Sequence, residues 1–325
     1  MTALHGPTDS IRWCCPEHHD PLLYDKDSLR CASGSHSFQI LRDIPRFVAE
    51  SSYADHFGSQ WNVFRKTQLD SFTGFPITRD RLRRCLGEQL WTSLAGKRVL
   101  ECGCGAGRFT EILLGEGALV TSIDLSSAVE ANADQFPPGS QHAIAQADIR
   151  HLPFASQSFD VVMCLGVVQH TPNPEETIAC LYDQVKPGGT LILDHYFLTL
   201  SWYLKTAPLF RLAMKRMSPG TAMGFTKSLV NIFLPLHRAT KKIPVVRSIV
   251  HRISPVMCYY SAYPELPETL QREWALLDTH DSLTDYYKHS RSPESLRATL
   301  EKLGLRDIWC SLGGNGVEVR GLRPS

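Results

Sequence analysis

Short apolar runs alternate with longer mixed stretches through the middle of the chain, between residues 97 and 196. Five runs have the length and composition of strands: Arg98–Cys102, Ala118–Asp124, His142–Ala147, Phe159–Leu165 and Thr190–Asp194. The fourth run is apolar almost throughout, as expected for a strand that is buried on both faces of a sheet. Strands that alternate with helical stretches predict a parallel sheet with crossover helices, which is the α/β architecture.

The regions on either side of this alternation have other patterns. Residues 49–96 are typical of helices and rich in aromatic side chains, and we expect them to form a cap in which Phe57 and Trp61 close over a bound cofactor. The last part of the chain predicts a helix near residues 293–303, followed by a hairpin around Gly313–Gly316.

Composition is that of an ordinary globular enzyme, with 43% hydrophobic and 21% charged residues over 325 positions and a formal net charge of +1. This balance gives no global reason to expect nucleic acid or a membrane as a partner. The start of the chain has no apolar signal region, and no run reaches the roughly 18 apolar residues of a membrane span. Because ten cysteines occur without a secretion signal, we expect thiols or metal ligands in a cytoplasmic protein.

A glycine-rich turn follows the first predicted strand directly and precedes a helix. Gly103, Gly105 and Gly107 have no Cβ atoms, so the backbone can turn tightly and approach a ligand closely. The spacing G-x-G-x-G differs from the G-x-G-x-x-G of dinucleotide-binding proteins, and Arg108 stands where that pattern has its third glycine. Glu101, just before the turn, would repel a pyrophosphate but attract the cationic amino group of a methionine moiety.

Two carboxylates follow the next two strands. Asp124 ends the second strand, where it can accept hydrogen bonds from both ribose hydroxyls of an adenosine. Asp148 follows the third strand, where it can accept from the exocyclic amine of an adenine while Ile149 packs against the ring. The turn and these side chains together predict a site for a cofactor that contains adenosine and methionine.

Five motifs in this order resemble those of class I S-adenosylmethionine-dependent methyltransferases, in particular the UbiE-like group that methylates small molecules. The motifs are Leu100–Gly107, Ser122–Ser126, Ala147–Phe154, Ser158–Val162 and Val185–Gly189. The resemblance implies a Rossmann-like fold with a seven-stranded, mostly parallel sheet, whose antiparallel last strand would come from the C-terminal hairpin. We expect S-adenosylmethionine to be bound by Glu101, Gly103, Gly105, Gly107, Asp124, Leu125, Asp148, Ile149, Leu165 and Gln169.

Methyl transfer is an in-line displacement, so the protein mainly has to align the acceptor with the methyl group, and a hydroxyl acceptor is also helped by a base. The catalytic candidates are His170, after the fourth strand, and His195 and Tyr196, at the end of the fifth. In the alternative interpretation, His170 shapes the methionine pocket and His195 only lines it. A third polar cluster, residues 278–281, is interpreted as a solvated helix cap.

Clustered cysteine and histidine side chains occur within the first 48 residues. Two pairs have the spacing of metal ligands: Cys15 with His18, and Cys31 with His36. Such pairs fit a tetrahedral structural zinc site and resemble the zinc knuckle that opens some rRNA guanine methyltransferases, with a histidine where a cysteine is usual. Cys14 and His19 are alternative ligands, and the other interpretation is a degenerate knuckle that binds no metal.

Residues 197–290 form an insertion of unusual charge. Between Asp194 and Glu265 the chain has ten lysine and arginine residues and no acidic residue, mixed with aromatic and aliphatic side chains. In methyltransferases of this kind the segment commonly builds a lid, so the charge predicts an anionic or amphipathic acceptor, or contact with an anionic membrane surface. The other interpretation is a solvated lid, balanced by acidic residues such as those of Glu265–Glu273.

Three parts are therefore expected: a zinc-knuckle-like segment over residues 1–48, a helical cap over 49–96, and a methyltransferase domain over 97–325 that carries the basic lid. The expected activity is methylation of a small-molecule or lipid-like acceptor, with S-adenosylhomocysteine as the product. Two alternatives stay open. One is an RNA methyltransferase, favoured by the cysteine–histidine head and the basic lid, and the other is a regulator that binds S-adenosylmethionine without transferring its methyl group.

Overall fold

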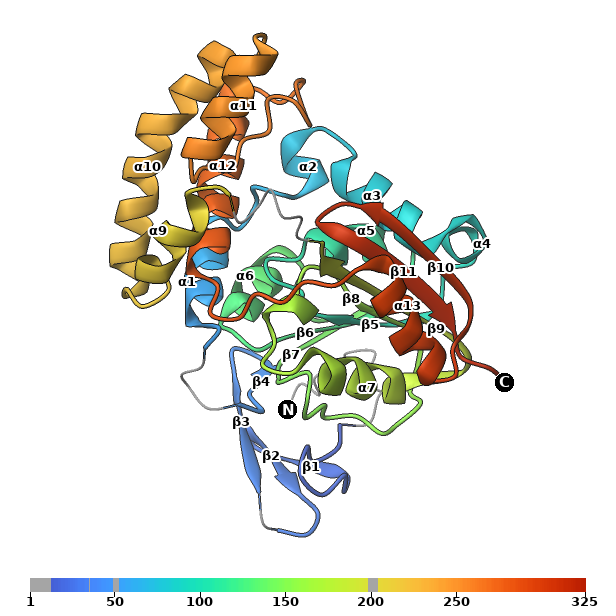
Figure 1. Cartoon of the computed structure of the whole chain (residues 1–325). Coiled ribbons are helices and arrows are strands. Elements are labelled where there is room, and N and C mark those ends of the chain that lie inside the picture. Colours follow the sequence, from blue (N-terminus) through green and yellow to red (C-terminus); the bar gives the residue numbers. More distant parts are fainter. Residues whose placement is uncertain (1–12, 35, 49–52, 198–203) are drawn as a thin grey trace.

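The computed structural model describes residues 13–34, 36–48, 53–197 and 204–325. Its centre is a seven-stranded sheet in the order β10-β11-β9-β8-β5-β6-β7 (Figure 1). The strands are β5 Arg98–Cys102, β6 Leu119–Asp124, β7 His142–Gln146, β8 Phe159–Cys164, β9 Val185–Tyr196, β10 Arg306–Gly313 and β11 Gly316–Leu322. Strands β5 to β9 pair in parallel, whereas β11 pairs antiparallel with both β9 and β10. The predicted Rossmann-like sheet is confirmed, including the antiparallel strand from the C-terminal hairpin.

One strand begins earlier than the sequence predicts. The run Thr190–Asp194 is extended in the structure to β9, Val185–Tyr196, so that the motif Val185–Gly189 lies inside the first part of this strand. The pairing of β8 with β9 shifts its register there, and Gly188 has a φ of 74°. The pairing is therefore irregular at this point of β9, where glycine permits the unusual backbone angle.

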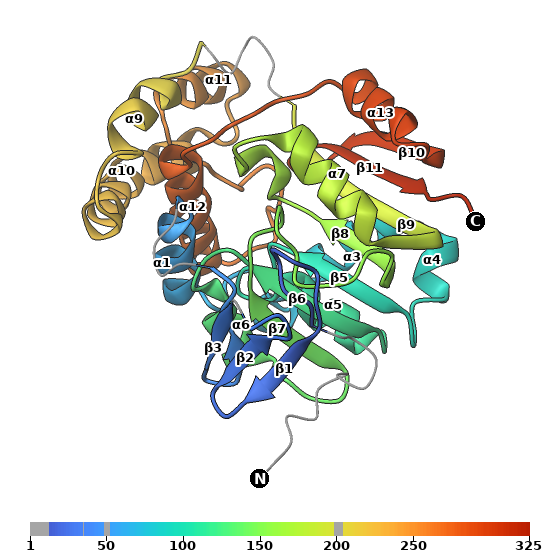
Figure 2. The same cartoon turned by 90° about the horizontal axis from the view of Figure 1, so that it is seen from below.

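Helices cover both faces of the sheet (Figure 2). They are α3 Ile77–Leu86, α4 Glu88–Thr92, α5 Arg108–Gly115, α6 Ala128–Gln135, α7 Pro174–Gln184 and α13 Pro293–Lys302. Neighbouring strand residues point to opposite faces. Val99 accordingly packs in a cluster with side chains of α3, α4 and α5, whereas Leu100 packs with side chains of α7 and α13.

The N-terminal segment forms a small antiparallel sheet of its own. Its strands are β1 Leu22–Asp25, β2 Ser28–Cys31, β3 Ser37–Leu41 and β4 Ile44–Pro45. The Trp13 ring lies 5.3 Å from that of Phe154, and the backbone N–H of Phe47 donates to the Gln146 carbonyl at 2.8 Å. These contacts fasten the small sheet to the main sheet at its β7 edge.

The lid consists of α9 Ala207–Met214, α10 Pro219–Thr240, α11 Pro244–Ile253 and α12 Glu268–Thr284 (Figure 1). Residues 198–203, part of the predicted lid, and 49–52, part of the predicted cap, lie outside the described residues. Helix α1, Asp55–Val63, packs against α6 and α12, whereas α3 and α4 cover the sheet. The helices of the predicted cap therefore divide between lid and sheet, and α2, Asp70–Thr73, lies between them in the chain. None of the described helices is long and apolar enough to cross a membrane.

Candidate cofactor and acceptor site

The glycine-rich turn lies between β5 and α5, at the carboxyl end of the parallel strands. Gly103, Gly105 and Gly107 have φ angles of 76°, 52° and 95°, in the left-handed region that favours glycine. A Cβ atom on Gly103 would lie 2.1 Å from the Val167 side chain, and one on Gly105 would lie 3.1 Å from the Trp61 indole. The turn is thus closed over by the aromatic side chain of α1, and a larger residue at Gly103 would displace its neighbour.

Glu101 is buried beneath this turn, with 1% of its surface exposed. Its Oε2 accepts hydrogen bonds from the hydroxyls of Thr110, at 2.6 Å, and Ser122, at 3.0 Å. Its Oε1 has no hydrogen-bond partner among the described residues. Burial raises the pKa of the Glu101 carboxyl to about 7. Because an unpaired buried carboxylate oxygen is costly, it fits a cationic group of a ligand, such as the amino group of methionine.

Glu101 belongs to a buried polar network that the sequence analysis did not predict. Thr110 accepts a hydrogen bond from Asn132 Nδ2 at 2.9 Å, and Ser122 Oγ lies 3.0 Å from His142 Nε2. Burial lowers the pKa of His142 to about 4, so the imidazole is neutral at physiological pH. The sequence did contain a signal for this network, namely polar residues within otherwise apolar strands and helices. Such residues are usually buried only when they have hydrogen-bond partners.

Asp124, at the end of β6, already holds the turn in place. Its Oδ2 accepts from the Gly105 N–H at 3.0 Å, and its Oδ1 accepts from the N–H and hydroxyl of Ser126 at 2.8 and 2.7 Å. A carboxylate has about four acceptor positions. Three are filled here, so Asp124 can accept one ribose hydroxyl without releasing a partner, where the sequence had suggested two.

The remaining predicted cofactor residues differ in their exposure. Asp148 is held by Arg150, whose Nη2 donates to Oδ2 at 2.7 Å. Ile149 and Leu165 are each 6% exposed, and Leu125 is half-buried. Gln169 is fully buried, yet neither its Oε1 nor its Nε2 has a hydrogen-bond partner in the part of the chain that the structure describes. This orphaned amide, like Glu101, marks a place for a polar ligand group.

Two of the three catalytic candidates meet beside Gln169. His170 Nδ1 lies 3.1 Å from the Tyr287 carbonyl oxygen and 3.5 Å from Asp285 Oδ2. Because both of these oxygens accept, Nδ1 carries the proton and Nε2 accepts from the Tyr196 hydroxyl at 3.2 Å. Burial lowers the pKa of His170 to about 4, and burial raises that of the Tyr196 hydroxyl. The structure therefore contains an Asp–His–Tyr chain, and the Phe57 ring packs on the histidine at 5.3 Å.

His195 does not join this pair. It is adjacent to Tyr196 in β9, and neighbouring side chains of a strand point to opposite faces. The charges of Arg291, His289 and His170 lower the pKa of His195, whereas carboxylates such as Asp281 and Asp285 raise that of the Tyr196 hydroxyl. Burial lowers the pKa of His195 to about 4, and its Nε2 has no partner within the described segments.

The polar cluster at residues 278–281 is not a solvated helix cap, which corrects the expectation from the sequence. It lies within α12, where His280 is fully buried and Thr226 Oγ1 is 3.2 Å from its Nδ1. Asp278 accepts hydrogen bonds from the Tyr259 hydroxyl and from Gln68 Nε2. Burial and the neighbouring carboxylates raise the pKa of Asp281 to about 8. Thr279 and His280 are buried and the two aspartates are partly buried, because α12 packs on α1, α9 and α10 instead of facing water.

Comparison with known proteins identifies the family of the segment that contains the glycine-rich turn. A family model described as a methyltransferase domain matches residues 100–193. The ubiquinone biosynthesis O-methyltransferase of Pseudomonas putida is 42% identical over 108 residues, which cover 31% of this chain and 45% of that protein. That of Methylococcus capsulatus is 36% identical over 120 residues, or 36% and 49% of the two chains. Residues 100–193 belong to a class I methyltransferase domain.

The match spans less than half the length of these curated relatives. Among solved structures, the magnesium protoporphyrin IX methyltransferase of Synechocystis covers 75% of this chain and 93% of its own, with 17% identity and a TM-score of 0.38. The methyltransferase domain thus accounts for the glycine turn and for Glu101, Asp124 and Asp148, while the head and the lid lie outside the matched range.

The N-terminal segment brings its four predicted metal ligands together. Cys15 Sγ lies 3.5 Å from His36 Nδ1 and 3.9 Å from His18 Nδ1, and Cys31 Sγ lies 3.8 Å from the same His18 atom. Asp20, which was not predicted, is 3.9 Å from Cys31 Sγ. The alternative ligands Cys14 and His19 belong to neither of the ligand groups found at this end of the described chain.

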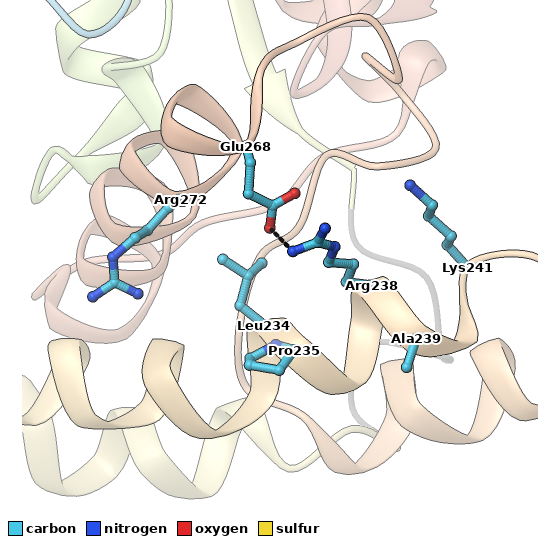
Figure 3. A pocket seen from close by; sticks show the side chains of 7 residues that line it. All are labelled: Leu234, Pro235, Arg238, Ala239, Lys241, Glu268 and Arg272. Carbon is cyan, nitrogen blue, oxygen red and sulfur yellow. Dashed lines mark ion pairs between the residues drawn. The ribbon is translucent and has the colours of Figure 1, made fainter.

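The lid has an exposed apolar stripe and a basic cavity. On α11, Val245, Ile249 and Ile253 are 73%, 54% and 50% exposed, and their spacing of four residues puts them on one face. A cavity of about 460 Å³ opens between α10 and α12 (Figure 3). Its apolar lining comes from Leu234, Pro235 and Ala239, and its charged lining from Arg238, Lys241, Arg272 and Glu268.

Proposed function

We propose that this protein transfers a methyl group from S-adenosylmethionine to a hydroxyl group of a small, lipid-like acceptor. The observation that carries the proposal is the unpartnered Glu101 Oε1 beneath the three glycines. It fits the amino group of the cofactor and would repel the pyrophosphate of a dinucleotide. Bound there, the cofactor supplies an electrophilic methyl group. The names of the curated relatives, O-methyltransferases of ubiquinone biosynthesis, support a hydroxyl acceptor of amphipathic character.

His170 and Tyr196 are the residues we assign to the acceptor proton. Tyr196 gives its proton to the neutral Nε2 of His170 and takes the proton of the acceptor hydroxyl, so the attacking oxygen gains negative charge as it attacks. Asp285, 3.5 Å from His170 Nδ1, stabilises the imidazolium that forms. Trp61 and Phe57 on α1 exclude water above the turn. His195 serves as a lining residue in this proposal.

Calorimetric titration tests the cofactor assignment. We expect S-adenosylmethionine and S-adenosylhomocysteine to bind and NADH not to bind. Asp124→Asn should weaken binding, because an amide cannot accept from both Gly105 and Ser126 as the carboxylate does. Asp307→Asn, on the exposed part of β10, is the matched control. Binding of NADH, or equal binding by the two variants, would contradict the assignment.

A finer proposal concerns the lid. We propose that its outer face docks on an anionic membrane surface, from which an amphipathic acceptor would enter. Ten positive charges without a negative one lie between Asp194 and Glu265, and the exposed stripe of α11 adds apolar area beside them. This combination of basic and apolar residues is typical of helices that lie in the membrane interface.

Co-sedimentation with vesicles tests the docking. The protein should pellet with vesicles that contain phosphatidylglycerol and stay in solution with phosphatidylcholine alone. Ile249→Asp should lower the affinity by about tenfold or more, since inserting an isoleucine contributes about 1.5–3 kcal/mol. Leu312→Asp on β10 replaces an equally exposed leucine, 58% exposed, and should change nothing. Recovery of the unsubstituted protein in the supernatant of both vesicle types would end the proposal.

For the head, we propose a structural zinc ion held by Cys15, His18, Cys31 and His36. Tetrahedral bonds of about 2.3 Å to sulfur and 2.0–2.1 Å to nitrogen place these atoms about 3.6 Å apart. The sulfur-to-nitrogen distances of 3.5, 3.8 and 3.9 Å are close to that value. Stoichiometric zinc that is lost in Cys31→Ser, together with lower stability, is the expected result. Zinc-free protein of unchanged stability would show a degenerate knuckle.

A further inference from the structure

A second cluster of metal-binding side chains lies in the lid, far along the chain from the cysteine–histidine head. His237 on α10, His251 on α11 and Cys258 just after α11 each offer one ligand atom, and these three atoms lie within 4.8 Å of one another. His251 Nε2 is 3.8 Å from Cys258 Sγ, and the two imidazole rings are 4.7 Å apart. We propose that His237, His251 and Cys258 bind a zinc ion that fastens α11 to α10.

The hydrogen bonds of His237 leave one nitrogen for a metal. His237 is 2% exposed, and its Nε2 lies 2.8 Å from Ser254 Oγ. Its Nδ1 is buried and has no hydrogen-bond partner among the residues that the structure describes. Histidines that bind metals usually donate their other N–H to a neighbouring oxygen, which fixes the tautomer. With Nε2–H donated to Ser254, the lone pair of Nδ1 is free to bind an ion.

The donor set selects the kind of ion. Two imidazole nitrogens and one thiolate suit Zn²⁺, whereas Mg²⁺ and Ca²⁺ require oxygen ligands. The distance of 3.8 Å between His251 Nε2 and Cys258 Sγ is near the tetrahedral value of about 3.6 Å. The thiol of Cys258 binds the metal as a thiolate, and its proton goes to solvent when the metal binds.

The elements that carry the ligands are themselves well anchored. Ser254 Oγ also accepts from the Val256 N–H at 3.1 Å, and the Met257 N–H donates to Thr279 Oγ1 of α12 at 2.9 Å. His251 and Cys258 are partly exposed, so an ion can enter from solvent. The ion would hold α11 with its apolar stripe turned outward. The metal site does not depend on the proposed membrane docking or on methyl transfer.

Zinc content per chain tests the site directly. The full-length protein and its variants are stripped with a chelator, dialysed against zinc chloride, freed of excess metal and analysed by atomic emission. Cys258→Ser and His251→Gln should each contain one zinc ion fewer per chain than the unsubstituted protein. Because the result is a difference, it holds whether or not the head binds zinc. Cys310→Ser, a partly exposed cysteine on β10, should keep the full content.

Thermal unfolding provides a second readout. Added zinc should raise the melting temperature of the unsubstituted protein more than that of Cys258→Ser, while the two melt alike in chelator. Equal melting in chelator shows that the variant is folded. Equal zinc content in Cys258→Ser, His251→Gln and the unsubstituted protein would overturn the proposal, as would a cysteine variant that retains the full zinc-induced shift.

Discussion

Replacing Glu101 by glutamine tests the most unusual electrostatic feature of the site. Burial raises the pKa of this carboxyl from an ordinary 4.5 to about 7, so the folded protein holds a proton there that the unfolded chain releases. The free energy of unfolding therefore falls as pH rises through the interval between these two values. One pKa unit corresponds to 1.36 kcal/mol. The carboxyl should thus cost the unsubstituted protein about 2.5 kcal/mol of stability between pH 5 and pH 8.

Glu101→Gln keeps the shape and removes the titration. Urea unfolding at pH 5 and pH 8 should show the variant gaining about 2.5 kcal/mol relative to the unsubstituted protein over this range. The buried amide adds a cost of its own, but that cost is the same at both pH values and cancels. Glu301→Gln, an exposed glutamate on α13, is the control. A difference between Glu101→Gln and the unsubstituted protein that stays constant from pH 5 to pH 8 would refute the reasoning.

The same variant should lose cofactor affinity. A hydrogen bond to a charged group contributes about 1.5–3 kcal/mol, so binding of S-adenosylmethionine should weaken roughly 10- to 150-fold. Binding of the cofactor by the unsubstituted protein near pH 7 should also release a proton, because the ammonium group favours the carboxylate. Calorimetry in buffers of different ionisation enthalpy measures that proton. Unchanged affinity would show that Glu101 does not face the ligand.

Three other substitutions test separate parts of the structure. An alanine with left-handed backbone angles costs about 1–2 kcal/mol of stability. Gly96→Ala, with open space around the new Cβ atom, should show only this cost in urea unfolding. Gly103→Ala should destabilise the protein by more, since its Cβ atom also clashes with a neighbouring side chain. Arg81→Met removes a buried guanidinium from two carboxylates and should cost about 3–5 kcal/mol in the same assay. Arg211→Met should raise the pKa of His170, measured by NMR titration of labelled histidines; an unchanged or lower value would contradict this.

The sheet could be predicted because its strands are buried and short. The run Phe159–Leu165 has almost no polar residue, and the glycine turn follows its strand without a spacer. The position of the C-terminal hairpin, whose second strand β11 pairs with β9, could be predicted only from the family resemblance. No local sequence pattern tells which strand the hairpin joins. Packing of α1 on the turn was foreseen from its aromatic residues, but the separate positions of α3 and α4 depend on tertiary contacts.

The acceptor side was harder to predict, although signals were present. Asp278, Asp281 and Asp285 follow one another at spacings of three and four residues, which places them on one helical face. That spacing indicates that the three carboxyl groups share one environment. Their sequestration from water could not be predicted from it, because acidic helix faces are usually exposed to solvent. The strand period alone separates His195 from Tyr196, because adjacent residues cannot both point into one pocket. Distances between segments far apart in sequence were not accessible.

Asp285 connects a positive charge of the lid with His170, because it pairs with Arg211 and lies 3.5 Å from His170 Nδ1. This carboxylate is fully buried and pairs with Arg211 of α9 and, at 2.8 Å, with Lys288. Burial is the main cause of the lowered pKa of His170, Asp285 acts against it, and the two cations lower the pKa further. Burial is therefore the main reason that the imidazole is neutral, and the positive charges of Lys288 and Arg211 act in the same direction. In the proton transfer that we propose, Arg211 would help to keep Nε2 of His170 able to accept the proton of Tyr196, and this role is separate from the attraction of an anionic surface to the lid.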